Sequence, residues 1–286
     1  KRHKGSDALI CTNCNHPKVC GGSCCSCLDE IHFPDVHPMG KKVYDCFLLL
    51  NYYVCRYSYK YCSEIEYALS TLDDFLSLKK YKVMSIGCGG APDLMALEYY
   101  FKSRNLHNPI HYIGYDINEL WKPIHDKIKE YESDIFEAHF YYVDAIEYFE
   151  KYYVKDVNVV ILQYVISYFY NNNQIDKIDS FFDNLVDNIV LGGRKGKLYI
   201  IINDVNSYRR GRDFFQLMFR KLKDNRLNAK MWQRYFDYNI KQEGQRYGRP
   251  HHSCSCLHTI PDSISSFYCC AKHCSSAQLL FEVEPI

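Results

Sequence analysis

The hydrophobic pattern of the chain changes character at Tyr81. Before this point, apolar residues recur at helical spacing and predict helices over residues 44–60 and 63–79. Ser63 and Glu66 have the spacing of a capping box, so we expect the second helix to begin at Ser63.

After Tyr81, short apolar runs alternate with helical patterns. This alternation predicts an α/β fold with a mostly parallel sheet covered by helices on both faces. Two final runs, 264–270 and 278–283, leave no room for a long helix between them and predict a terminal antiparallel pair. The predicted strands are 82–86, 110–115, 140–143, 157–162 and 197–202, and the predicted helices include 92–103 and 175–190.

The chain of 286 residues is long enough for about two domains, and 47% apolar residues allow a full core. We expect a Cys-rich module at 1–42, a helical connector at 43–80 and a sheet domain at 81–286 with an insertion at about 205–262. The apolar runs fall short of the roughly 18 residues of a membrane span, so no membrane partner is expected.

Cysteine is distributed unevenly along the chain. Six of the 15 cysteines lie in residues 11–27 and five in residues 254–274. The odd count, the CxxC spacing and the lack of an apolar signal-peptide core in residues 1–7 favour a reducing compartment, the cytoplasm or the nucleus.

Two CxxC pairs near the N-terminus have the spacing of a metal site. The pairs Cys11/Cys14 and Cys24/Cys27 are separated by nine residues, and four thiolates at such spacing complete a tetrahedron around Zn²⁺. The alternative is a loop with free thiols. Cys20 and Cys25 are further donors, which leaves room for a second ion, and a zinc module of this kind can also hold a protein partner.

The C-terminal cysteines have a weaker pattern, because Cys254 and Cys256 do not form a CxxC pair. We interpret them as candidate ligands of a metal, shared with the N-terminal cluster or separate from it.

A Gly-rich turn follows the first predicted strand. Gly87 and Gly89 allow a ligand to approach the backbone, and the following helix offers free N–H groups at its start. Pro92 occupies the third position of the dinucleotide fingerprint, which disfavours NAD and FAD. The lysine pattern of nucleoside triphosphate loops is absent.

In these features the chain resembles the class I S-adenosylmethionine-dependent methyltransferases over about residues 81–286. The resemblance rests on residues 83–90 as the cofactor loop, on Asp116 and Asp144 at the ends of the second and third strands, and on 159–163 as the fourth strand. It implies a doubly wound, mostly parallel seven-stranded sheet with a terminal antiparallel hairpin, and S-adenosylmethionine as the cofactor. One departure is Ser85, which stands where many members have an acidic residue, and another is the longer gap between the loop and Asp116.

The resemblance also implies roles for single residues. Gly87 and Gly89 would approach the methionine part, Asp116 would accept hydrogen bonds from the ribose hydroxyls, and Asp144 would meet the adenine amino group. Gln163 would border the transferred methyl group.

Alternatives remain for these residues. Asp116 and Asp144 could instead cap the helices that follow them. Tyr164 also borders the transferred methyl group by the resemblance and is, with Gln163, a candidate catalytic residue, although packing explains a tyrosine equally well. Trp121 could stack on the adenine or lie in the core.

The methyl acceptor has a weaker signature. Residues 209–252 contain twelve Lys or Arg and four acidic residues, a local charge of +8 in a chain whose net charge is +1. Aromatic residues are interleaved, which favours RNA binding, with Arg209, Arg210 and Arg212 as candidate phosphate contacts. The simpler explanation is a solvated helix with Phe215 facing the core.

The sequence thus predicts a zinc-containing S-adenosylmethionine-dependent methyltransferase that acts on RNA. The alternatives are a methyltransferase for a protein or a small molecule, and a non-catalytic zinc-containing assembly protein with the same fold.

Overall fold

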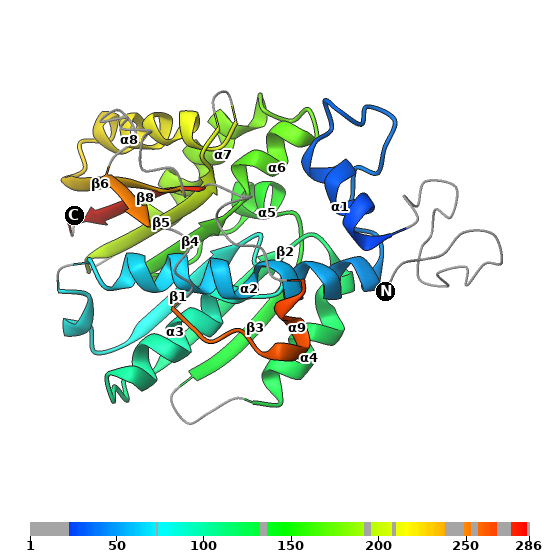
Figure 1. The fold of residues 1–286 in the computed structure, drawn as a ribbon. Helices are drawn as coiled ribbons and strands as arrows, with labels where there is room; N and C mark the ends of the chain where they lie inside the picture. The colour runs from blue at the N-terminus through cyan, green and yellow to red at the C-terminus, as the bar shows by residue number, and fades with distance from the viewer. Residues whose placement is uncertain are drawn as a thin grey trace.

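The structure is a computed structural model, and it describes residues 23–284 except for 73, 132–135, 192–195, 208–209, 238–248, 253–256 and 268–275. A single sheet crosses the molecule, and helices cover both of its faces (Figure 1). The strands are β1 (Tyr81–Ile86), β2 (Ile110–Asp116), β3 (Phe136–Tyr142), β4 (Val159–Gln163), β5 (Leu198–Val205), β6 (Ala229–Asp237), β7 (Arg249–His252) and β8 (Ser276–Val283). The α-helices are α1 (Cys24–His32), α2 (Phe47–Leu69), α3 (Pro92–Ser103), α4 (Lys122–Lys129), α5 (Ala145–Lys151), α6 (Ile166–Asn171), α7 (Lys177–Leu185), α8 (Phe215–Asp224) and α9 (Asp262–Ser265).

The strand order within the described residues is β3-β2-β1-β4-β5-β8-β6-β7. Strands β1 to β5 pair in parallel, and β8 lies antiparallel between β5 and β6. The mostly parallel, doubly wound sheet with a terminal antiparallel pair is therefore confirmed. A short strand, β7, pairs in parallel with β6 and extends the sheet beyond the seven predicted strands.

The members of the antiparallel pair differ from the prediction. The run at 278–283 lies in β8, but its second partner besides β5 is β6 and not 264–270. Residues 264 and 265 belong to the short helix α9, and 268–270 lie outside the described residues. β6 and β8 are thus joined by a connection much longer than a hairpin loop. The prediction paired 278–283 with the run nearest in sequence, 264–270, and was therefore wrong.

Alternation along the strands fills two cores. Met84 and Ile86 of β1 face the core under α5, α7 and α8, whereas Tyr81 and Val83 face the core under α2 and α3. Both faces of the sheet are buried, as the continuous apolar strands predict. A third, smaller cluster joins α1 to the first half of α2 and includes Cys27, Leu28 and Ile31.

The predicted break between the first two helices is absent, because α2 runs without interruption through Ser63. The hydroxyl of Ser63 donates to the carbonyl of Tyr59 at 2.7 Å, a bond that a serine makes inside a helix and not at its start. The capping-box prediction was therefore wrong. Among the described residues of the remainder of the second predicted helix, the helical structure is the short 3₁₀ helix Phe75–Ser77.

The other helices follow the predictions more closely. α3 has the predicted bounds, and the predicted helix at 175–190 is α7 extended by a π-helical turn at Val186–Val190. Within the described part of the chain, no helix combines the length and the apolarity that crossing a membrane requires.

Candidate functional site

A cavity of about 910 Å³ lies where the carboxyl ends of the parallel strands meet. Residues that follow β1, β2, β3, β4 and β5 line it, and residues of α1, α2 and α6 complete its wall. This is the edge at which α/β sheets bind ligands, and the volume falls within the roughly 300–1,000 Å³ of small-molecule sites.

The turn after β1 needs its glycines. Gly87 and Gly89 have φ angles of +63° and +52°, in the left-handed region that residues with a Cβ rarely adopt. A Cβ at Gly87 would lie 2.8 Å from the Cγ2 of Val165. Both glycines line the cavity, as the sequence predicts for a loop that approaches a ligand.

Asp116 lies at the end of β2 and faces this turn. One of its carboxylate oxygens accepts from the backbone N–H of Gly89 at 2.9 Å, and the other accepts from the N–H of Asn118 at 2.8 Å. Burial disfavours the charged form and raises the pKa of Asp116 to about 6, although both backbone donors oppose the shift. Asp116, which the sequence predicts at the site, thus lies at the cavity and binds the glycine turn, while Asn118 caps the 3₁₀ helix Glu119–Trp121.

Asp144 and Trp121 also line the cavity. Asp144 is the N-cap of α5, and its carboxylate accepts from the N–H of Ile146 at 2.9 Å, so the capping alternative is confirmed. Trp121 is buried, and its ring lies against Gly89: a Cβ added to this glycine would be 3.6 Å from the Cζ2 of Trp121. The roles of Asp144 and Trp121 toward adenine stay predictions.

The two candidate catalytic residues follow each other at the end of β4. The amide nitrogen of Gln163 donates to the carbonyl of Tyr61 at 3.1 Å, while its buried Oε1 has no hydrogen-bond partner among the described residues. Tyr164 has a φ of +59°, which costs a tyrosine about 1 kcal/mol or more.

A buried polar network fixes Tyr164. Its hydroxyl lies 2.7 Å from the Nζ of Lys60 and 3.1 Å from the Oε2 of Glu64, and its ring stacks on Tyr61 with the centroids 4.2 Å apart. Lys60 also donates to the hydroxyl of Ser276 on β8 at 3.2 Å. The phenol hydroxyl is thus held by Lys60 and Glu64 of α2, and Tyr164 lines the cavity.

An aromatic wall formed by α1, α2 and the segment between them was not predicted from the sequence. Tyr53, Tyr57 and Tyr61 occupy one face of α2 and line the cavity together with His32 and Tyr44. Their spacing of four residues is a signal that sequence reasoning could have used, but the many tyrosines in this chain hid it.

Two hydrogen bonds and burial keep His32 in place. Its Nε2 lies 2.8 Å from the hydroxyl of Tyr44, and its Nδ1 lies 3.5 Å from the hydroxyl of Tyr57. Burial, reinforced by the positive charge of Arg56, lowers the pKa of His32 to about 4. The imidazole is therefore neutral at pH 7, and Arg56 brings positive charge to the same wall.

Most of the predicted zinc ligands lie outside the described residues. Cys11, Cys14, Cys20, Cys254 and Cys256 are outside the described residues. Cys24 and Cys27 lie one turn apart on α1, with Cys27 buried and Cys25 exposed near Asp29. An N-terminal zinc site stays a prediction.

The three arginines predicted to meet phosphate have different surroundings. Arg209 is outside the described residues. Arg210 forms an ion pair with Asp35 at 2.6 Å, lies over the ring of Tyr170 and lines the cavity. Arg212 forms hydrogen bonds with Asn206, so Arg210 and Arg212 both already have partners within the chain.

The cavity fits the cofactor that the sequence implies. The turn at Gly87 and Gly89 lets a ligand approach the backbone, and the carboxylate of Asp116 lies beside it. The buried Oε1 of Gln163 has no hydrogen-bond donor among the described residues. The ribose hydroxyls and the amino groups of S-adenosylmethionine are donors of this kind.

Comparisons with known proteins give structural neighbours only. No protein-family model and no curated protein matches the chain. Among solved structures it is similar to the plantazolicin methyltransferase BpumL in complex with SAH, with 14% identity, a TM-score of 0.44 and coverage of 91% of this chain and 95% of that one.

Two further neighbours have comparable scores. Phosphoethanolamine N-methyltransferase 1 of Haemonchus contortus is 11% identical, with a TM-score of 0.44 and coverage of 79% of this chain and 43% of that one. The [4+2]-cyclase SpnF is 12% identical, with a TM-score of 0.43 and coverage of 77% and 81%.

Proposed function

We propose that the protein is an S-adenosylmethionine-dependent methyltransferase. The observation that carries the proposal is the position of Asp116, which lies at the cavity and binds the backbone of the glycine turn that follows the neighbouring strand. A carboxylate at this place suits a ligand with two adjacent hydroxyl groups, and the glycine turn suits its close approach.

When bound, S-adenosylmethionine supplies an electrophilic methyl group on a sulfonium. The residues of the chain would then bind and orient the cofactor and keep water out of the cavity. Asp116 would hold the ribose, the backbone at Gly87 and Gly89 would approach the methionine part, and the Oε1 of Gln163 would accept a hydrogen bond.

For the methyl acceptor, we place a small molecule first. The tyrosines of α2, together with His32 and Tyr44, give the cavity an aromatic wall beside the cation of Arg56, and such a wall suits a compact organic acceptor better than a phosphate chain. His32 contributes a neutral imidazole to this wall, and because burial and the charge of Arg56 lower its pKa to about 4, it is a weak base.

RNA is the second candidate, and the charge of +8 over residues 209–252 is the observation in its favour. The partners of Arg210 and Arg212 within the chain weaken this candidate, because binding phosphate would require breaking those contacts. The two acceptors differ in salt dependence, since phosphate contacts make binding fall steeply with salt.

Incubation of the full-length protein with radiolabelled S-adenosylmethionine and separate RNA, protein and metabolite fractions tests both candidates. We expect label in the metabolite fraction, and far less of it when Asp116→Ala replaces the wild type at a cofactor concentration near the wild-type dissociation constant. Label in RNA would select the second candidate. Failure of the cofactor to bind in a calorimetric titration would overturn the proposed function.

The pKa of Asp116 predicts a pH dependence for cofactor affinity. Only the ionised carboxylate accepts hydrogen bonds with both oxygens, and protonation becomes dominant below a pKa of about 6. Affinity should therefore be constant above this value and fall about tenfold as the pH is lowered from 7 to 5. Asp116→Asn should remove this dependence, while an unchanged slope would assign it to another group, with Asp204 as the next choice because its pKa is also about 6.

A further inference from the structure

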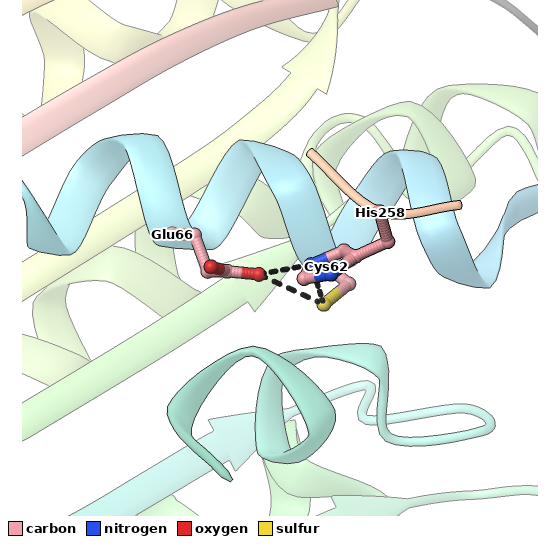
Figure 2. A group of neighbouring side chains, drawn as sticks. All are labelled: Cys62, Glu66 and His258. Carbon is pink, nitrogen blue, oxygen red and sulfur yellow. Dashed lines mark hydrogen bonds and ion pairs between the residues drawn. The ribbon is translucent and has the colours of Figure 1, made fainter. Parts of the chain in front are cut away.

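Three potential metal ligands meet away from the cavity. Cys62 and Glu66 lie one turn apart on α2, and His258 comes from the segment that follows β7 (Figure 2). The Sγ of Cys62 lies 3.6 Å from the Nε2 of His258 and 3.4 Å from the Oε1 of Glu66. Glu66 and His258 form an ion pair through the same two atoms, so all three ligand atoms face one point.

The surroundings hold the three side chains in place. Cys62 is fully buried, and the side chains of Glu66 and His258 are only 12% and 16% exposed. The His258 ring stacks on Tyr99 with the centroids 4.2 Å apart, and the N–H of Leu257 donates to the hydroxyl of Ser63 at 3.0 Å. The ring is therefore oriented by packing, with its Nε2 directed at the thiol and the carboxylate.

The chemistry of this set favours zinc. Thiolate, imidazole and carboxylate are the protein ligands of Zn²⁺, and tetrahedral bonds of about 2.0–2.3 Å separate neighbouring ligand atoms by roughly 3.4–3.6 Å. The two contacts of the Cys62 sulfur match these separations. An ion would replace the direct contact between Glu66 and His258, and binding would release the thiol proton to solvent.

We propose that Cys62, Glu66 and His258 bind a Zn²⁺ ion that fastens the segment between β7 and β8 to helix α2. The fourth position is open to water or another donor. In the sequence, Cys254 and Cys256 precede His258 by four and two residues, but both lie outside the described residues, so their role as ligands stays a prediction.

The position of the site gives the ion a structural role. None of the three ligands is among the residues that line the cavity, but α2 also carries Tyr53, Tyr57 and the other tyrosines of the aromatic wall. The same segment contacts α2 again further along, where the carbonyl of Phe267 accepts from Arg56 at 3.5 Å. In Figure 1 the orange part of the chain accordingly lies beside this helix.

Metal analysis of the full-length protein tests the site. Zinc per chain should fall by one equivalent in Cys62→Ser and in His258→Ala relative to the wild type. Cys55→Ser is the matched control, because it removes a thiol from the same helix two turns earlier and should keep the full zinc content. Zinc bound by the N-terminal cysteines would be the same in all of these proteins and cancels in the comparison.

A second measurement guards against variants that fail to fold. His258→Cys supplies another zinc ligand at the same position and should recover the equivalent that His258→Ala loses. Cobalt in place of zinc should give the wild type a thiolate-to-metal absorption band that weakens in Cys62→Ser and stays unchanged in Cys55→Ser. Equal zinc content and equal cobalt spectra in the wild type and Cys62→Ser would overturn the proposal.

Discussion

Replacing Asp116 with alanine is expected to weaken S-adenosylmethionine binding about a hundredfold. A hydrogen bond to a charged group contributes about 1.5–3 kcal/mol, and a tenfold change in affinity corresponds to about 1.4 kcal/mol. Asp116 lines the cavity beside the glycine turn, so in the alanine variant water cannot fully replace its hydrogen bonds to the cofactor. Calorimetric titration of the cofactor and of its demethylated product would measure the loss.

The substitution has a second effect that needs a control. Asp116 also accepts from the N–H groups of Gly89 and Asn118, so its loss can disturb the turn as well as the ligand contact. Asp116→Asn keeps one acceptor oxygen and should lose less affinity than Asp116→Ala. Asp126→Ala, on the exposed side of α4, should bind like the wild type. Unchanged affinity in Asp116→Ala, with the melting temperature preserved, would remove this residue from the cofactor site.

The sheet and the position of the cavity could be predicted because their signals are local. β1, β2 and β4 are short apolar runs, β2 and β4 end at the polar residues Asp116 and Gln163, and the carboxyl ends of parallel strands meet at one edge. Asp116 and Gln163 were therefore placed correctly without any knowledge of the strand order.

The predictions failed where the information is not local. Ser63 has a capping-box partner at Glu66, yet the packing of Ile65, Ala68 and other residues of α2 against the sheet keeps the helix continuous. Tertiary packing overrides a cap signal in this way, because one buried apolar face outweighs a single capping bond. The pairing of β8 with β6 is equally invisible, since 38 residues separate Asp237 from Ser276 and no turn motif connects them.

The ligands of the proposed zinc site could not be grouped from the sequence either, because they are distant along the chain. Cys62 falls between the two predicted helices, Glu66 was interpreted as part of a capping box, and His258 lies nearly two hundred residues further along. Only the fold brings the imidazole to the helix. The aromatic wall could have been predicted in part, because Tyr53, Tyr57 and Tyr61 follow one another at intervals of four residues along α2.

Replacing Lys60 with methionine is expected to destabilise the fold by about 3 kcal/mol or more. Lys60 and Glu64 form an ion pair whose side chains are 3% and 4% exposed, and Glu64 would be left buried without this cation. The network also holds Tyr164 in its left-handed conformation, so the loss extends to the end of β4. Urea denaturation of the wild type and the variant would measure the change in the free energy of unfolding.

Two further proteins separate the ion pair from general damage to the helix. The double variant Lys60→Met with Glu64→Gln removes both charges, and because no unpaired carboxylate remains, it should be more stable than Lys60→Met alone. Lys122→Met is the matched control, since Lys122 and Asp126 form an ion pair with the same spacing on α4 but are about half exposed. Its unfolding midpoint should stay close to that of the wild type, because water already screens that pair. If Lys60→Met and Lys122→Met unfold at the same urea concentration, the network of Lys60, Glu64 and Tyr164 does not stabilise the contact between α2 and the end of β4.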